Sequence, residues 1–91
     1  MNFTHNDKLY SLDESSITFA EAEAIEEVCG LPFHLVGAQV MIGSLRPQRA
    51  VAWIAMKREN PETTFDDLSS FPIESIVWKY ETSDVVADSP K

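Results

Sequence analysis

The chain has 91 residues, of which 44% are hydrophobic and 24% are charged, a composition typical of a globular domain and not of a disordered chain. The formal net charge is −8 at pH 7, which argues against a nucleic-acid-binding protein, because phosphate contacts require a basic surface. The single Cys29 cannot form an intrachain disulfide and no signal peptide is recognisable, so we expect the protein to stay in the reducing cytoplasm where it is made.

Residues 1–12 predict a small β-hairpin. Asn6 and Asp7 tolerate turn geometry and separate two short stretches that contain apolar residues. A lone hairpin is marginally stable in water, so it should pack against helices through apolar side chains. The candidates for this packing are Phe3, Leu9 or Tyr10, and Leu12. Residues 13–16 form a polar connection.

A capped helix is predicted to follow, ending at Gly30. Thr18 and Glu21 have the spacing of a capping box, and glycine is favoured just after a helix. Glu23, Glu26 and Glu27 should point away from the core, either as solvated surface or toward a basic partner within the chain or on another copy.

Residues 33–42 predict a second, short helix, because Pro32 precedes them and Gly43 follows. The β-branched residues in this segment keep a strand as the alternative. His34 is interpreted as a surface or hydrogen-bonded histidine and not as a metal ligand.

The central element is a helix at about 45–59. Residues 50–56 are seven apolar residues in a row, far fewer than the roughly 20 that cross a bilayer, so they indicate a buried helix. Pro47 fits the first turn, and Pro61 follows the end. At 100° per residue the apolar side includes Leu45, while Arg46, Arg49, Trp53 and Lys57 share a narrow stripe. We expect the arginine stems to cover the Trp53 ring and the charges to meet the chain's own glutamates, with a partner site as the alternative.

The last segments are shorter. Residues 65–68 predict one or two helical turns after a threonine cap, and Pro72 starts a predicted helix at 73–81. An alternating strand at 76–80 is the alternative. Trp78 would be an outward contact residue on the helix, or it would close over the core. Residues 82–91 are polar and acidic and should be a flexible tail.

No pattern for chemistry stands out. His5, His34 and Cys29 lack the spacing of a zinc site, the glycines are too dispersed for a phosphate loop, and no nucleophile has an evident base. We therefore predict no enzyme, no catalytic residue, no metal and no cofactor.

Three stretches, FTHNDKLYSLD, ITFAEAEAIEEVCGLPF and GSLRPQRAVAWIAMKRENPETTFDDLSSFPIESI, together resemble the small tail assembly chaperones of long-tailed bacteriophages, in particular those infecting actinobacteria. The likeness covers about residues 3–76 and lies in the order of structural motifs: a capped acidic helix, a central helix with arginines and a tryptophan, then a proline and a Thr-Phe-acidic turn. It implies a protein that coats the tape measure protein, helps deliver tail tube subunits, forms oligomers and is absent from the virion. Many such chaperones also have a longer, frameshifted form.

Residues 33–42 depart from that family because they are unusually apolar for an exposed helix. We expect them to form a self-association surface. The predicted partner or self-association residues are Phe33, Val36, Val40, Met41, Arg46, Arg49, Trp53, Lys57 and Trp78.

The predicted fold is mainly α: four to five short helices surround the central one, with an N-terminal hairpin, in a single domain at 1–81. Two other functions compete with a chaperone: a structural connector or minor capsid or tail subunit that stays in the particle, and a small acidic inhibitor of a host nucleic-acid enzyme.

Overall fold

The computed structural model describes residues 1–79, which form a small, mostly helical domain with a three-stranded antiparallel sheet. The α-helices are α1 (Phe19–Cys29), α2 (Phe33–Met41) and α3 (Leu45–Glu59). The strands are β1 (Asn2–His5), β2 (Lys8–Ser11) and β3 (Ile76–Lys79). Short 3-10 helices occur at η1 (Glu14–Ser16), η2 (Asp66–Ser70) and η3 (Ile73–Ser75). The predicted tail at 82–91 lies outside the described residues.

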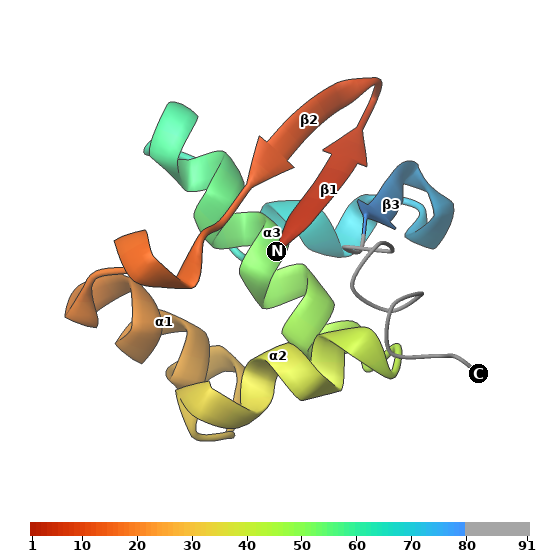
Figure 1. Cartoon of the computed structure of the whole chain (residues 1–91). Coiled ribbons are helices and arrows are strands. Elements are labelled where there is room, and N and C mark those ends of the chain that lie inside the picture. Colours follow the sequence, from red (N-terminus) through yellow and green to blue (C-terminus); the bar gives the residue numbers. More distant parts are fainter. Residues whose placement is uncertain (80–91) are drawn as a thin grey trace.

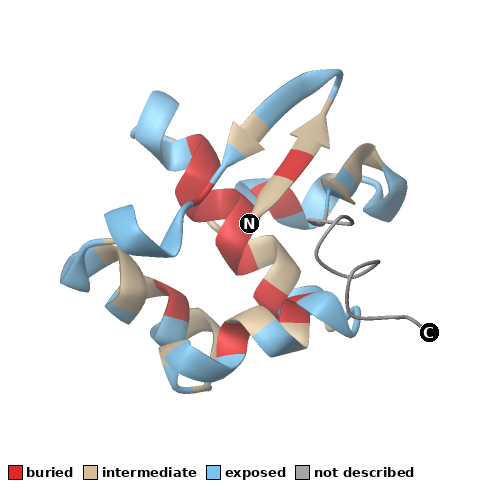
Figure 2. Ribbon diagram, viewed as in Figure 1, coloured by how far each residue is buried: buried red, intermediate tan, exposed pale blue. Residues whose placement is uncertain are grey.

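Helix α3 is the centre of the domain. It crosses the middle of the molecule, with the sheet on one side and α1 and α2 on the other (Figure 1). Residues 50–56 are all buried, as predicted, and Figure 2 shows the buried segment along the middle of α3. Leu45 was expected on this apolar side but is 57% exposed, whereas Pro47 in the same turn is buried.

The first helix has the predicted capping. The Thr18 hydroxyl accepts the Glu21 amide at 3.1 Å, and the Glu21 carboxylate accepts the Thr18 amide at 3.1 Å, so both capping-box bonds form. Gly30 ends α1 at φ 71°, in the left-handed region that favours glycine. The three glutamates predicted to face outward are exposed. One of them, Glu26, accepts the Phe33 amide at 2.7 Å and so caps the start of α2.

The second segment is a helix, and the strand alternative is wrong. Val36 and Val40 face inward and are buried in the chain's own core. This corrects the prediction that they contact another copy, since a side chain already packed inside the domain offers no surface to a partner. Phe33 is half-buried against the core, and Met41 is 63% exposed.

The hairpin is confirmed. Asn6 and Asp7 have φ angles of 53° and 68°, the pair of positive values that a tight two-residue hairpin turn requires. Phe3 and Leu12 are fully buried, and the Tyr10 ring stacks on Phe3 at 5.2 Å between centroids. Leu9, the alternative to Tyr10, is exposed.

The helix predicted at 73–81 is wrong over its described part, and the strand alternative is confirmed there. One 3-10 turn, η3, follows Pro72, and the chain then extends as β3. Strand β3 pairs antiparallel with β1, so that Ile76 lies opposite His5 and Trp78 opposite Phe3. The free edge of β1 supplies backbone partners that a helix at this position would not use. The described residues therefore contain three α-helices instead of four to five.

Candidate binding groove at the start of α3

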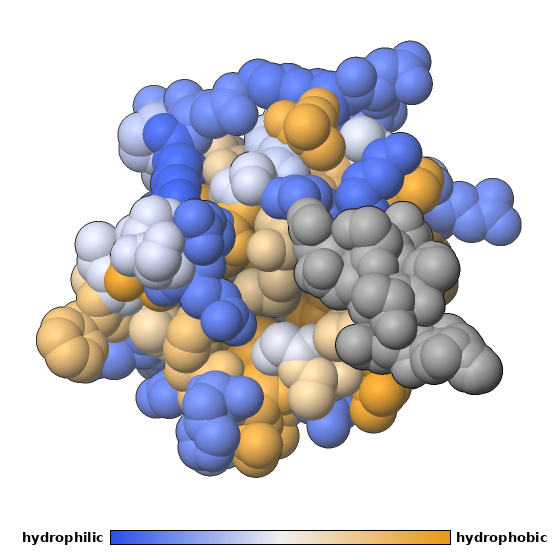
Figure 3. Space-filling view, viewed as in Figure 1, coloured by the Kyte–Doolittle hydropathy of each residue, from blue (hydrophilic) through white to orange (hydrophobic). Residues whose placement is uncertain are grey.

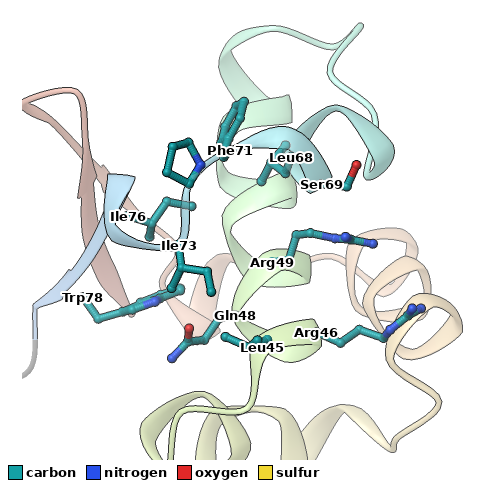
Figure 4. A pocket seen from close by; sticks show the side chains of 11 residues that line it. Leu45, Arg46, Gln48, Arg49, Leu68, Ser69, Phe71, Ile73, Ile76 and Trp78 are labelled. Carbon is teal, nitrogen blue, oxygen red and sulfur yellow. The ribbon is translucent and has the colours of Figure 1, made fainter.

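A groove of about 340 Å³ runs beside the first turns of α3, and we call it the α3 groove. It is bordered by α3, η2, η3 and β3. Its apolar lining consists of Leu45, Leu68, Phe71, Pro72, Ile73, Ile76 and Trp78. Figure 4 shows Ile73, Ile76 and Trp78 on one side of α3, while Arg46 and Arg49 extend to the other side. Ile73 is 70% exposed, so apolar surface is accessible at the rim of the groove.

The two arginines pack on Phe65, and not on Trp53 as predicted. The guanidinium carbon of Arg49 lies 3.8 Å from the centroid of the Phe65 ring, and that of Arg46 lies 5.8 Å from it. The chain reverses after α3 and brings Phe65 against the basic stripe. Nothing in the sequence places Phe65 there, because the contact depends on the path of that reversal.

Trp53 is one of the predicted site residues that the structure places inside the domain. The residue is only 9% exposed, and its indole N–H donates to the Thr63 carbonyl at 3.0 Å. Lys57 lies over the Trp53 ring at 5.2 Å, and Phe65 meets the ring edge-on at 5.6 Å. Trp53 therefore supports the wall behind the arginines and is not itself a contact residue, which corrects the prediction.

The expected pairing of the basic stripe with glutamates is wrong among the described residues. The ion pairs within residues 1–79 are Arg58 with Glu21, at 2.7 Å, and Lys8 with Glu59. Neither involves Arg46, Arg49 or Lys57. Arg46 donates to the Val28 carbonyl at 3.1 Å instead. The Nε of Arg49 is buried and has no hydrogen-bond partner in this part of the chain.

The start of α3 also breaks the usual rules for a helix N-terminus. Ser44 is at the N-cap position, but its side chain makes no capping bond, and the first turn contains Arg46 and no acidic residue. A cation is disfavoured near the positive end of a helix, where acids are stabilising. A helix end that lacks its usual stabilising groups is typical of a functional site, so this end of α3 is a candidate.

Two alternatives were open for Trp78: it would be an outward contact residue, or it would close over the core. Its ring is half-buried and packs against Phe3 at 5.0 Å between centroids, and it also lines the α3 groove. It therefore closes over the core while its remaining surface is available to a bound molecule.

A second, smaller hollow of about 260 Å³ lies between α1 and α3. Its charged lining residues are Glu21, Lys57 and Arg58. Arg58 pairs with Glu21 and also donates to the Ser16 carbonyl at 3.1 Å, so two of the three charged groups are already engaged within the chain.

His5, His34 and Cys29 are the side chains that could have carried metal or thiol chemistry. Within residues 1–79 no group of three histidine, cysteine or acidic side chains could hold a metal ion. Burial raises the pKa of the Cys29 thiol, which keeps it protonated at neutral pH. His34 is exposed at the surface, and His5 stacks on Phe71 at 4.6 Å.

No protein-family model, no curated protein and no solved structure matches this chain. In the part that the structure describes, every helix is too short or too polar to cross a bilayer.

Proposed function

We propose that this chain is a non-catalytic tail assembly chaperone of a long-tailed bacteriophage, which binds the tape measure protein in the host cytoplasm and assists tail tube assembly. The observation that carries the proposal is the α3 groove, an open apolar surface beside arginines that pair with no carboxylate among residues 1–79. The tape measure protein is proposed as the client because residues 3–76 resemble such chaperones.

The groove suits a helical client on physical grounds. An amphipathic helix binds by placing a few apolar side chains into a groove between elements of its receptor. Ile73 and Leu45 are large and exposed and both line this groove, and removing such apolar surface from water is favourable. A long, helix-rich protein such as a tape measure protein offers many segments of this type.

Binding along a long client favours repeated sites. Copies of the chain that associate would present several grooves at once, and linked sites increase avidity without any new contact. Exposed apolar side chains at the end of α2, Met41 and Ile42, are available for such association, and Figure 3 shows apolar surface over the α2 end of the molecule. Light scattering of the purified protein measures this association directly.

The test is co-expression of the chain with the tape measure protein. We expect the two to co-purify, and we expect Ile73→Asp to lose the complex because it places a charge on the groove rim. Val77→Asp is the matched control, since Val77 is also exposed on the same segment but does not line the groove. Failure to retain the tape measure protein, or equal loss with both variants, would contradict the proposal.

Mass spectrometry of purified virions separates the chaperone from a structural subunit. A chaperone should be missing from the particle or strongly under-represented, whereas a connector or minor capsid or tail subunit would be present in fixed stoichiometry. Finding the chain at fixed stoichiometry would overturn the proposal.

A further inference from the structure

We infer that the α3 groove selects a helical segment that is apolar on one side and carries two carboxylates one turn apart on the other, and that Arg46 and Arg49 bind those carboxylates. The inference rests on the proposed function in using the same groove, but it adds a charge requirement on the client that the proposed function does not contain.

The first argument is the missing partner of the two arginines. Twelve of the chain's fifteen acidic residues lie within the described residues 1–79, and none of these twelve pairs with Arg46 or Arg49. Arg58 shows what the chain does with an arginine that serves stability, because the Nε and a terminal nitrogen of Arg58 hold both carboxylate oxygens of Glu21. The Nε of Arg49 is buried without an acceptor among the described residues, so the chain does not use this guanidinium as it uses that of Arg58.

The second argument is spacing. Arg46 and Arg49 are three residues apart on a straight helix, which places them about 4.5 Å apart along its axis, at roughly 1.5 Å per residue. Carboxylates three or four residues apart on a partner helix are separated by about 4.5 or 6 Å along its axis and lie on one face. Each arginine presents a planar fork that binds a carboxylate through two parallel bonds, which fixes the position of the partner as well as attracting it.

The third argument is the two-sided shape of the site. Ile73 and Trp78 lie on the opposite side of α3 from the arginines (Figure 4). A segment lying across the first turns of α3 therefore meets apolar side chains on one flank and guanidinium groups on the other. The whole chain, these two arginines included, has a net charge of −8, so an acidic segment is repelled overall and attracted only where basic groups gather, as they do here.

The experiment uses the full chain and two fluorescein-labelled helical peptides, read by fluorescence anisotropy. Both peptides carry leucines along one side; one has glutamates at two positions a turn apart on the other side, and the second has lysines there. We expect the glutamate peptide to bind about tenfold more tightly than the lysine peptide. Equal affinity for the two peptides would overturn the inference.

Charge reversal on the protein provides the matched control. Arg46→Glu should lower the affinity for the glutamate peptide and raise the affinity for the lysine peptide. Arg46 is exposed, so its change leaves the core intact. Lys57→Glu makes the same change in net charge at an exposed position outside the groove, and it should leave the preference unchanged. Circular dichroism confirms that both variants are folded. A Lys57→Glu effect as large as that of Arg46→Glu would mean that only overall charge matters, and it would overturn the inference.

Three further outcomes are informative. Displacement of the glutamate peptide by a single-stranded oligonucleotide at matched charge would show a general anion site, against the inference. If the peptides do not discriminate but the tape measure protein still co-purifies, the charge requirement fails while the proposed function stands. If the two peptides differ in affinity as expected but no tape measure protein is retained, the charge requirement stands while the proposed function fails.

Discussion

The two ends of α3 belong to the same helix but meet their surroundings in opposite ways. From the middle of α3 to its C-terminal end, residues 50–56 are buried, Arg58 and Lys57 suit the negative end of the helix, and Arg58 is paired with Glu21. At its N-terminal end, Leu45 is exposed and the Ser44 side chain makes no capping bond. Arg46 and Arg49 have no carboxylate partner among residues 1–79.

This difference separates stability from binding. In the middle and C-terminal part of α3, apolar side chains are buried and Arg58 is paired within the chain, so changes there should unfold or destabilise the domain. At the N-terminal end, Leu45 is exposed and the arginines have no carboxylate partner among residues 1–79, so changes there should affect affinity for a partner and leave the fold intact. Residues that the domain uses for its own packing can therefore be compared directly with residues that it leaves available.

The largest effect is expected from Val36→Glu in α2. Val36 is fully buried, so the change places a carboxylate in the core, at a cost comparable to the whole stability of a small domain, on the order of 5 kcal/mol. We expect an unfolded protein by circular dichroism. Met41→Glu on the same helix is the control, because Met41 is exposed and should tolerate the charge. A folded Val36→Glu variant that differs only in assembly size would restore the association surface first predicted for this helix.

The next effect tests the two ends of α3 directly. Ile54→Ala removes a buried side chain and leaves a cavity, which should lower the free energy of unfolding by about 2 to 4 kcal/mol in urea denaturation. Leu45→Ala should change it by less than about 0.5 kcal/mol because Leu45 is exposed. Similar losses for the two variants would remove the distinction between the ends of the helix.

Arg58→Ala should cost about 1 to 2 kcal/mol, since it removes a two-pronged pair on a partly buried carboxylate. The hydrogen bond from Arg58 holds the pKa of Glu21 below its ordinary value of 4.5. A lowered pKa stabilises the folded state fully above about pH 4.5 and loses that effect as pH falls through the folded value. Thermal unfolding of wild type and variant should therefore differ at pH 7 and converge in acid, while Arg46→Ala should show no such dependence.

The smallest effect compares the starts of α1 and α3. Thr18→Ala removes a capping bond and should lower the free energy of unfolding by about 1 kcal/mol. Ser44→Ala should change it by less than about 0.5 kcal/mol, because the Ser44 side chain caps nothing. Chemical denaturation measures both. A Ser44→Ala loss equal to that of Thr18→Ala would show that the start of α3 is capped in solution.

The features that sequence reasoning found are those that neighbouring residues determine. The Thr18 cap, the Gly30 end, the turn at Asn6 and the buried middle of α3 each depend on a few adjacent residues. For 73–81 the same reasoning found two competing periods, because the apolar residues fit both a helix and an alternating strand. The pairing of β3 with β1 decided between them, and that partner is more than seventy residues away in sequence.

The site was predicted in part for a similar reason. The 100° periodicity grouped Arg46, Arg49, Trp53 and Lys57 correctly, but it could not identify the ring that the arginines would cover. The groove needs Ile73 and Phe71, which come from a separate segment whose position depends on the reversal after α3. The periodicity of α2 indicated an apolar face, but whether Val36 met the chain's own core or another copy was a question of tertiary packing.

The order of strands has a consequence for synthesis. Strand β1 lies between β2, which follows it at once, and β3, which is made last among the described elements. A growing chain on the ribosome therefore carries β1 with one open edge, and Phe3 lacks its Trp78 neighbour until residue 78 has emerged from the exit tunnel. Closure of the sheet is then a late event, and a product interrupted before Ile76 would keep an unpaired edge that invites aggregation.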